Sequence, residues 1–199
     1  MLLAHSASTE HPLPPQNLAT GMPGFQVQDG AVSALVLRGC GLARLPAALG
    51  QLRQLRHLDL SGNALAELPD SLGNLTRLHT LILDHNLLSA LPPALQGLSG
   101  LTELHLDHNR LTGLPDWVGR LAALRILSAY GNQLTAMPAA LGGLTALREL
   151  DLRANRLTGL PASLGRLPAL EKLDLRWNKF WSPPAGLAPL EQRGCIVYR

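Results

Sequence analysis

Aromatic residues are scarce in this chain of 199 residues: they make up 4% of it, whereas hydrophobic residues as a whole make up 46%. Leu and Ala must therefore supply nearly all of any core. No apolar run approaches the ~18 residues that a membrane-spanning helix requires. The start of the chain, MLLAHSASTE, has neither a basic beginning nor a sustained apolar stretch. The sequence thus predicts no membrane span and no secretory signal peptide.

What the chain has in abundance is repetition, because leucines, prolines and asparagines recur at a constant step of 23 residues. The asparagines are Asn63, Asn86, Asn109, Asn132, Asn155 and Asn178, and the prolines are Pro69, Pro92, Pro115, Pro138, Pro161 and Pro184. A fixed period of roughly 20–29 residues is the signature of a solenoid. No unit of that kind buries its hydrophobic face alone, so the copies are expected to stack.

One unit, residues 55–77, reads LRHLDLSGNALAELPDSLGNLTR. Its alternating LDL piece predicts a short strand with both leucines inward. Asn63 follows at the turn, where an amide has the donors and the acceptor to bond the backbone of its own coil and of a neighbouring one. Pro69 suits the first position of a short helix. Gly73 is expected to keep that helix short, because Gly is unfavourable in helix interiors.

The form LxxLxLxxNxLxxLPxxLGxLxx covers Val32 to Gln192. It resembles a leucine-rich repeat protein of the LPxxLGxL type, similar to small bacterial repeat proteins and to the intracellular Ras-group-related and Ras-suppressor-like repeats. The resemblance implies an α/β solenoid of seven full repeats plus caps, with a curved parallel sheet on the concave face and short helices or 3-10 turns on the convex face. A stack of amphipathic helices is disfavoured because Pro recurs inside every unit.

The segments outside the regular repeats are expected to be a leader and two caps. Residues 1–24 include a Pro-Leu-Pro-Pro run and are interpreted as an irregular leader, either a loosely held tail or an address for secretion or docking. The repeat domain is expected over 25–199, with a hairpin cap at 25–31, repeats at 32–192 and a capping strand at 193–199. Asp29-Gly30 is the turn signal of the hairpin, and Ile196 and Tyr198 are expected to point inward.

Only two cysteines occur, and the repeat places Cys40 in the first coil and Cys195 in the last. About seven strand spacings of ~4.8 Å separate these two cysteines along the stack. They are therefore too far apart for a disulfide, which needs Cα atoms within ~7 Å. Cys40 takes the position that Asn holds in later coils and is interpreted as a packing residue. The chain is therefore expected in a reducing, cytoplasmic compartment, either of its own cell or, for a delivered effector, of a host.

Outward-facing residues of successive strands form four columns on the concave face, where function is expected. These columns hold seven acidic and four basic side chains, so the face is net negative although the whole chain has a formal charge of +3. Phosphate binding needs Lys and Arg gathered on the contacting surface. Nucleic acid is therefore not expected as a partner.

Two groups of candidate partner-binding side chains occupy these columns. Coils two to four present His57, Asp59, Asp84, His85, Glu103, His105, Asp107 and His108. Coils five to seven present Tyr130, Asp151, Arg153, Asp174, Arg176 and Trp177. Aromatic and Arg side chains are frequent hot spots, which makes the second group a candidate anchor, although a place in the C-terminal cap explains Trp177 equally well. Trp117, on the convex side, is expected to be a single exposed aromatic.

The first functional hypothesis is a non-catalytic protein–protein interaction module, a scaffold or signalling component, that binds a protein or peptide with a basic patch. The second, implied by the resemblance, is the recognition part of a bacterial secreted effector or ubiquitin-ligase system. The third is a metal site at His85 and His108 with Asp84 and Asp107. No nucleophile stands beside a His at a strained turn, so the chain is predicted to have no enzymatic activity. It is also predicted to be a monomer and to bind no cofactor.

Overall fold

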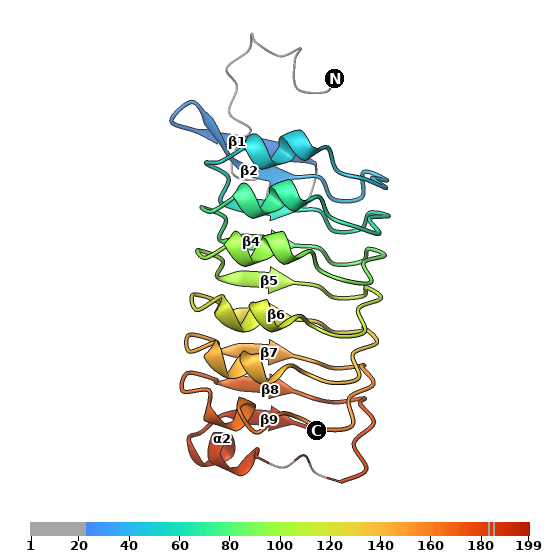
Figure 1. Ribbon diagram of the computed structural model, residues 1–199, viewed down its shortest axis with the longest axis vertical. Coiled ribbons are helices and arrows are strands. Elements are labelled where there is room, and N and C mark those ends of the chain that lie inside the picture. The colour runs from blue at the N-terminus through green and yellow to red at the C-terminus, as the bar shows by residue number, and fades with distance from the viewer. Residues whose placement is uncertain (1–22, 183, 185) are drawn as a thin grey trace.

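The computed structural model describes residues 23–182, 184 and 186–199, which form one sheet with short helices along one side (Figure 1). Over these residues the sheet has nine strands in chain order. They are β1 (Gly24–Gln28), β2 (Ala31–Val36), β3 (His57–Asp59), β4 (Thr80–Ile82), β5 (Glu103–His105), β6 (Ile126–Ser128), β7 (Glu149–Asp151), β8 (Lys172–Asp174) and β9 (Ile196–Tyr198). Of the predicted leader, residues 1–22 lie outside the described part.

The strand register repeats from coil to coil, which confirms the predicted leucine-rich repeat solenoid. β1 and β2 pair antiparallel, and the later pairs are parallel. Leu58 pairs with Leu81, and Leu81 with Leu104. The inward column made by Leu58, Leu81, Leu104, Leu127, Leu150 and Leu173 is at most 1% exposed. Each coil therefore buries its leucines against its neighbours rather than within itself.

The repeated asparagines form a ladder along one corner of the stack. Asn86 Oδ1 accepts the N–H of Leu65 at 3.0 Å, and Asn86 Nδ2 donates to the carbonyl oxygens of Leu60 and Leu83, both at 3.0 Å. The same three bonds recur at Asn63, Asn109, Asn132, Asn155 and Asn178. Backbone groups that turn inward at this corner are thereby satisfied.

Short 3-10 helices cover the other side of the sheet. They are η1 (Ala47–Gln51), η2 (Asp70–Asn74), η3 (Pro93–Gly97), η4 (Asp116–Arg120), η5 (Ala139–Gly143) and η6 (Leu164–Arg166), and the α-helix α2 (Ala188–Gln192) follows them. The sequence predicts Pro69 at the first helical position, whereas the structure places it one residue before η2, in an extended conformation with φ −71° and ψ 143°. The fixed φ of Pro suits this position as well.

The glycine of each LG pair is needed for the approach of the next coil. A Cβ built on Gly73 would lie 2.2 Å from the carbonyl oxygen of Ala94, and one built on Gly119 would lie 2.0 Å from that of Ala140. No side chain fits at such distances from a neighbouring backbone. Close packing between coils, rather than the helix length inferred from sequence, therefore accounts for these glycines.

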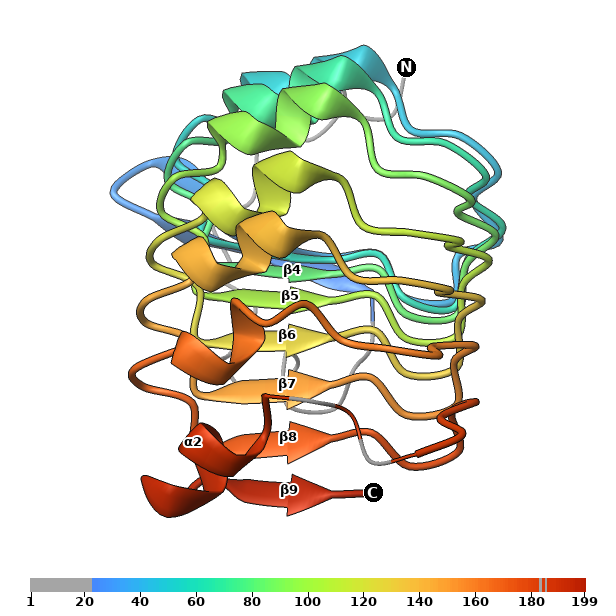
Figure 2. The same cartoon turned by 60° about the horizontal axis from the view of Figure 1, so that its bottom comes forward.

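One step of the helix layer is different. Gly73 and Gly119 face the residue 21 positions later, but coil three has Gln96 in the glycine position, and the residue 21 positions after it is Trp117 in coil four. Figure 2 shows η4 set further from η3 than η1, η2 and η3 are from one another. Trp117 fills this wider step and is only 8% exposed. The prediction of an exposed aromatic is therefore wrong.

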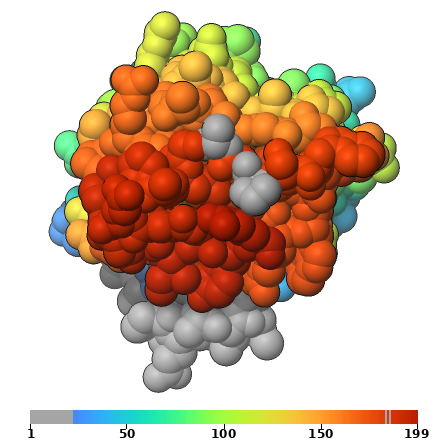
Figure 3. All heavy atoms as spheres, turned by 90° about the horizontal axis from the view of Figure 1, so that it is seen from below, coloured from blue at the N-terminus to red at the C-terminus, as the bar shows by residue number. Residues whose placement is uncertain are grey.

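The two ends of the stack are closed differently. At the N-terminal end β1 folds back on β2 through Asp29 and Gly30, whose φ values of 53° and 74° suit a tight hairpin turn. At the C-terminal end, α2 and β9 cover the last coil (Figure 3). None of the described helices is long and apolar enough to cross a membrane.

Candidate partner-binding surface

The candidate surface is the sheet face turned away from the 3-10 helices, called here the concave face. Parallel pairing places equivalent residues of successive coils side by side, as His57, Thr80 and Glu103 show. The face has two halves of different chemistry. The acidic half comprises residues 57–62, 80–85 and 103–108, and the paired half comprises residues 126–131, 149–154 and 172–177.

The acidic half has four carboxylates and no Lys or Arg, the carboxylates being those of Asp59, Asp84, Glu103 and Asp107. Two of them, Asp84 and Asp107, accept hydrogen bonds from the following coil. Asp84 Oδ1 accepts the N–H of Asp107 at 2.7 Å. Asp107 Oδ1 accepts the N–H of Tyr130 at 2.8 Å and the hydroxyl of Ser128 at 2.5 Å. Within the described residues, neither Asp84 nor Asp107 has a cationic side chain at ion-pair distance.

Asp84 shows the electrostatic cost of this arrangement. Burial raises the pKa of the Asp84 carboxyl above its ordinary 3.8, and the charge of Asp107 raises it further. The N–H of Asp107 and the nearby His105 and His85 act in the opposite direction without cancelling the rise. A cation brought to this pair of carboxylates from outside would relieve their repulsion. Within the described residues, the acidic half therefore carries negative charge that is not neutralised by a neighbouring cation.

The imidazole of His57 does not supply that cation at neutral pH. Burial lowers the pKa of His57 below its ordinary 6.5, although the charges of Asp59 and Glu103 oppose this change. His57 is thus mostly neutral at pH 7. In the same half, His105 Nε2 lies 3.7 Å from Glu103 Oε2.

His85 and His108 lie where the backbone is left-handed, with φ values of 54° and 53°. Gly62 and Gly131 occupy the same place in neighbouring coils, with φ values of 66° and 68°. Residues with a Cβ rarely adopt this conformation, and it costs them on the order of 1–2 kcal/mol. The two imidazole rings are exposed and stacked, with centroids 4.3 Å apart and planes at 16°.

The stacked arrangement does not support the third hypothesis, a metal site at these residues. Ring nitrogens of stacked imidazoles point along parallel planes and not toward one shared ion, whereas zinc needs ligands that converge tetrahedrally. Across residues 23–182, 184 and 186–199, no group of three or more His, Cys, Asp and Glu side chains is placed to hold a metal ion. The two rings cover one another's inner faces and His108 also contacts Tyr130, which leaves the outer face of His85 and the ring edges exposed.

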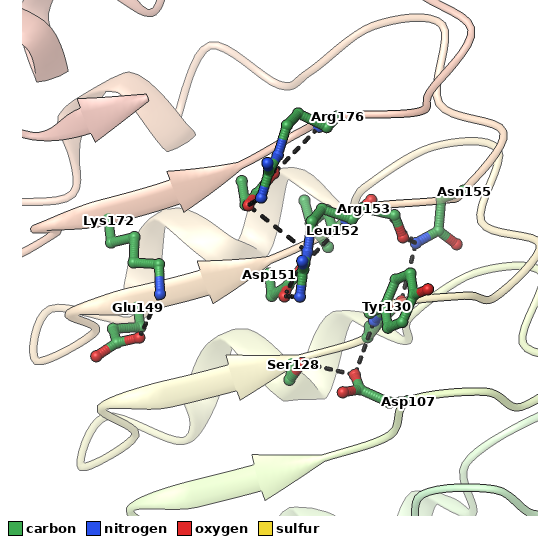
Figure 4. A network of polar contacts seen from close by, with 12 residues as sticks. Asp107, Ser128, Tyr130, Glu149, Asp151, Leu152, Arg153, Asn155, Lys172 and Arg176 are labelled. Atoms are coloured by element: carbon green, nitrogen blue, oxygen red, sulfur yellow. Dashed lines mark hydrogen bonds and ion pairs between the residues drawn. The ribbon is translucent and has the colours of Figure 1, made fainter. Parts of the chain in front are cut away.

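In the paired half every acid has a cation beside it (Figure 4). Arg153 Nη2 lies 2.6 Å from Asp151 Oδ2, and Arg153 Nε lies 3.6 Å from Asp174 Oδ2. Arg176 Nη2 lies 2.6 Å from the same Asp174 oxygen. The hydrogen bonds that the Arg153 side chain donates to Asp151 raise the pKa of Arg153 above its ordinary value. The acids and bases of this half cancel, which leaves no net charge.

Rings and guanidinium groups continue across both halves as a ring–guanidinium ladder, defined as His85, His108, Tyr130, Arg153, Arg176, Trp177 and Tyr198. The ring centroids of His108 and Tyr130 lie 4.6 Å apart in a T-shaped contact. Arg153 Cζ lies 4.8 Å from the Tyr130 centroid. Arg176 Cζ lies 5.5 Å from the Trp177 centroid and 5.1 Å from the Tyr198 centroid. Arg153 and Arg176 are linked through Asp174, which both of them contact, so the ladder with this carboxylate joins coils three to seven to the C-terminal cap.

Two residues predicted for partner contact are buried. Asp59 is 8% exposed and accepts the N–H and hydroxyl of Ser61 at 2.8 and 2.6 Å. Asp174 is 3% exposed and is held by Arg153 and Arg176. These carboxylates shape the surface from beneath and add charge to it, but they offer a partner almost no contact area.

Sequence reasoning missed Ile196 and Tyr198, which lie on the concave face and not inside. They are 57% and 39% exposed, and they pair with Lys172 and Asp174, whereas Val197 packs on the core. The expectation that they point inward is wrong because the last step in register is 24 residues, from 172 to 196. One extra residue turns every side chain of a strand to the other face.

The concave face has no deep cleft over its described residues. A shallow hollow of about 220 Å³ lies over β6, β7 and β8, and its lining includes His105, Ile126, Ser128, Glu149, Asp151 and Lys172. Sites that enclose a small molecule are usually concave pockets of about 300–1,000 Å³. A hollow of this size and shape suits one side chain of a partner resting on the sheet.

The repeat geometry agrees with the comparison to known families, since the family model described as a leucine-rich repeat region matches residues 31–189. The chain belongs to the leucine-rich repeat family. No curated protein matches it.

Several solved leucine-rich repeat structures have the same fold. The chain of the PEPR1–AtPEP1 structure is 35% identical with a TM-score of 0.72, and the match covers 83% of this chain and 24% of that one. The plant peptide hormone receptor RGFR1, solved in complex with RGF2, is 30% identical with a TM-score of 0.63, covering 69% and 23%. A leucine-rich repeat protein of Leptospira interrogans is 29% identical with a TM-score of 0.62, covering 80% and 46%. The match therefore spans less than half the length of each.

Proposed function

We propose that this leucine-rich repeat protein is a non-catalytic interaction module whose concave face binds a protein or peptide with a basic patch. The observation that carries the proposal is the acidic half, in which Asp84 and Asp107 lie on adjacent coils without a cation. Potentials of opposite sign steer association and select partners. The stacked coils hold these carboxylates on a rigid sheet, so little ordering cost is met on binding.

The relatives support the kind of surface and leave its ligand open. RGFR1 is a peptide receptor built on the same repeats, but the match spans less than a quarter of that chain. What we transfer to this chain, as part of the proposal, is the binding of a peptide. The effector and ubiquitin-ligase hypothesis stays a prediction.

We also propose a reducing compartment. Cys40 and Cys195 are both free thiols, and Cys40 is exposed. Burial raises the pKa of the Cys195 thiol, which keeps it protonated and unreactive. An exposed free thiol is compatible with a compartment that keeps cysteines reduced.

The test is affinity capture from the native host with three forms of the chain. The first is unchanged, the second carries Asp84→Lys and Asp107→Lys, and the third carries Asp70→Lys and Asp116→Lys. Asp70 and Asp116 lie in the first turns of η2 and η4, are exposed on the convex side and give the same change of charge. Partners bound through the concave face are expected to be lost from the second form and kept by the third.

If the second form captured the same partners as the unchanged chain, binding through the acidic half of the concave face would be refuted. Because Asp84 and Asp107 accept backbone hydrogen bonds, a further variant with Asp84→Asn and Asp107→Asn is needed. Its amide oxygens still accept those bonds, so the fold is retained while the charge is removed. Loss of the same partners from this variant separates charge recognition from misfolding.

A further inference from the structure

The paired half shows how a guanidinium group is held on this face. Arg153 lies over the ring of Tyr130 at 4.8 Å and is bound by Asp151 and Asp174 at 2.6 and 3.6 Å. Arg176 lies near the rings of Trp177 and Tyr198 and is bound by Asp174. Each guanidinium thus has an aromatic ring on one side and a carboxylate along its edge, an arrangement repeated on consecutive coils.

The acidic half has the same two kinds of group and no guanidinium. The column that carries Arg153 and Arg176 in coils six and seven carries Asp84 and Asp107 in coils three and four. The rings of His85 and His108 follow directly and are stacked. Rings and carboxylates are therefore present on adjacent coils, and the cation that completes the arrangement elsewhere on the face is not provided by the described chain.

We propose that the partner supplies it, and that arginine side chains of a peptide segment dock on coils three and four against the His85–His108 stack and the carboxylates of Asp84 and Asp107. The inference rests on the proposed function and narrows its partner from basic to arginine-bearing. The bound arginines continue the ring–guanidinium ladder from Tyr130 toward the N-terminal coils. Charge complementarity and the chain's own Arg153 and Arg176 identify the occupant.

Arginine suits this surface better than lysine. A guanidinium is planar, stacks on ring faces and donates two parallel hydrogen bonds to a carboxylate, whereas an ammonium is a compact, strongly hydrated charge. Stacking of a cation on an exposed ring raises the affinity by about two- to fivefold, and we expect arginine to gain this factor over lysine because the hydrated ammonium does not lie flat on a ring. The surface is therefore expected to distinguish two peptides of equal charge.

The location of the rings supports a contact role. His85 and His108 are exposed, although Asp59 and Asp174 on the same face are almost completely buried. Both rings are carried by left-handed backbone where neighbouring coils have Gly62 and Gly131. Non-glycine residues in strained conformations cluster at binding sites. Here the strain places two flat rings beside two carboxylates that lack a cation.

The experiment is a titration of the full chain at pH 7.5, followed through the imidazole NMR signals, with two capped hexapeptides. One alternates Arg with Gly, and the other alternates Lys with Gly. The Arg peptide is expected to shift the His85 and His108 signals saturably and to bind about two- to fivefold more tightly than the Lys peptide. Signals of His79, which lies before β4 and outside the concave columns, are expected to stay in place.

Two variants give the contributions of rings and charges. His85→Gly with His108→Gly removes the rings and relaxes the backbone, so the fold is not endangered. It is expected to abolish the preference for Arg, with the affinities read from the backbone amide signals of Asp84 and Asp107. Asp84→Asn with Asp107→Asn keeps the backbone hydrogen bonds and is expected to weaken the binding of both peptides by up to about fivefold for each charge removed. Asp70→Asn with Asp116→Asn, the matched convex control, is expected to bind as the unchanged chain does.

Equal affinity for the two peptides, or no saturable shift of His85 and His108 at millimolar Arg peptide, would overturn the inference. These results are distinguishable from failure of the proposed function. A partner captured by the unchanged chain and lost with Asp84→Lys and Asp107→Lys would still place binding on the acidic half, even if no arginine preference were found.

Discussion

The two halves of the concave face have similar numbers of acidic side chains, but the groups that bind these carboxylates differ between the halves. In the paired half, Arg153 and Arg176 neutralise Asp151 and Asp174. In the acidic half, backbone N–H groups hold Asp84 and Asp107. Hydrogen bonds satisfy a carboxylate without removing its charge. The paired half is therefore neutralised internally, whereas the carboxylates of Asp84 and Asp107 keep a charge that no cationic side chain of the described residues neutralises.

The largest effect is expected from breaking the paired half. Arg153→Met leaves Asp174, whose side chain is 4% exposed, with one cation fewer, and removes the hydrogen bonds to Asp151. We expect the free energy of unfolding to fall by about 2 kcal/mol, since a nearly buried charged group loses a partner. Urea denaturation at pH 7 measures it.

The matched control is Arg148→Met, which breaks the ion pair with Glu171. Those two side chains are 57% and 63% exposed, so the loss is expected to be about 0.5 kcal/mol or less. If Arg148→Met and Arg153→Met lowered the free energy of unfolding equally, the burial of Asp174 would not strengthen the ion pairs of the paired half.

The substitution His85→Gly, in the acidic half, is expected to stabilise the fold. Glycine adopts a φ of 54° without the cost that a Cβ imposes, so the free energy of unfolding is expected to rise by up to ~1 kcal/mol despite the lost stacking. His79→Gly, at an exposed residue without positive φ, is expected to lower it by about 0.5–1 kcal/mol. Thermal unfolding of both variants decides whether His85 is retained at a cost to stability.

The pH dependence gives a smaller effect, and two residues of the acidic half should show it in opposite directions. The pKa of Asp84 is raised in the folded chain, so its favourable contribution is complete below 3.8 and is lost as pH rises through the folded value. Asp84→Asn is therefore expected to gain stability relative to the unchanged chain between pH 4 and pH 7. Denaturation at a series of pH values measures this gain, and a constant difference would contradict it.

For His57 the sign is reversed. Its pKa is lowered in the folded chain, so its favourable contribution is present above 6.5 and is lost as pH falls through the folded value. Below pH 6.5, the stability of His57→Gln is expected to rise relative to that of the unchanged chain. A gain that appeared only above that pH would show that burial does not control His57.

The regular part of the fold and most of the candidate surface could be predicted from residue spacing. The 23-residue step places Asn86 beside Asn109 and Asp84 beside Asp107, because identical coils in parallel register align identical positions. Prediction failed where the spacing changed. Tyr198 lies on the concave face because the last step is 24 residues, and Trp117 is buried at the wider step of the helix layer, where the preceding coil has Gln96 in place of a glycine.

The sequence by itself determined the stacked coils, the asparagine ladder and the residues of each concave column, since these follow from one period that is read without coordinates. Only the tertiary structure decided which acids are neutralised, which are buried and which rings stack. Those outcomes depend on side-chain directions and distances between coils, where a change of a few ångströms separates an ion pair from a free charge.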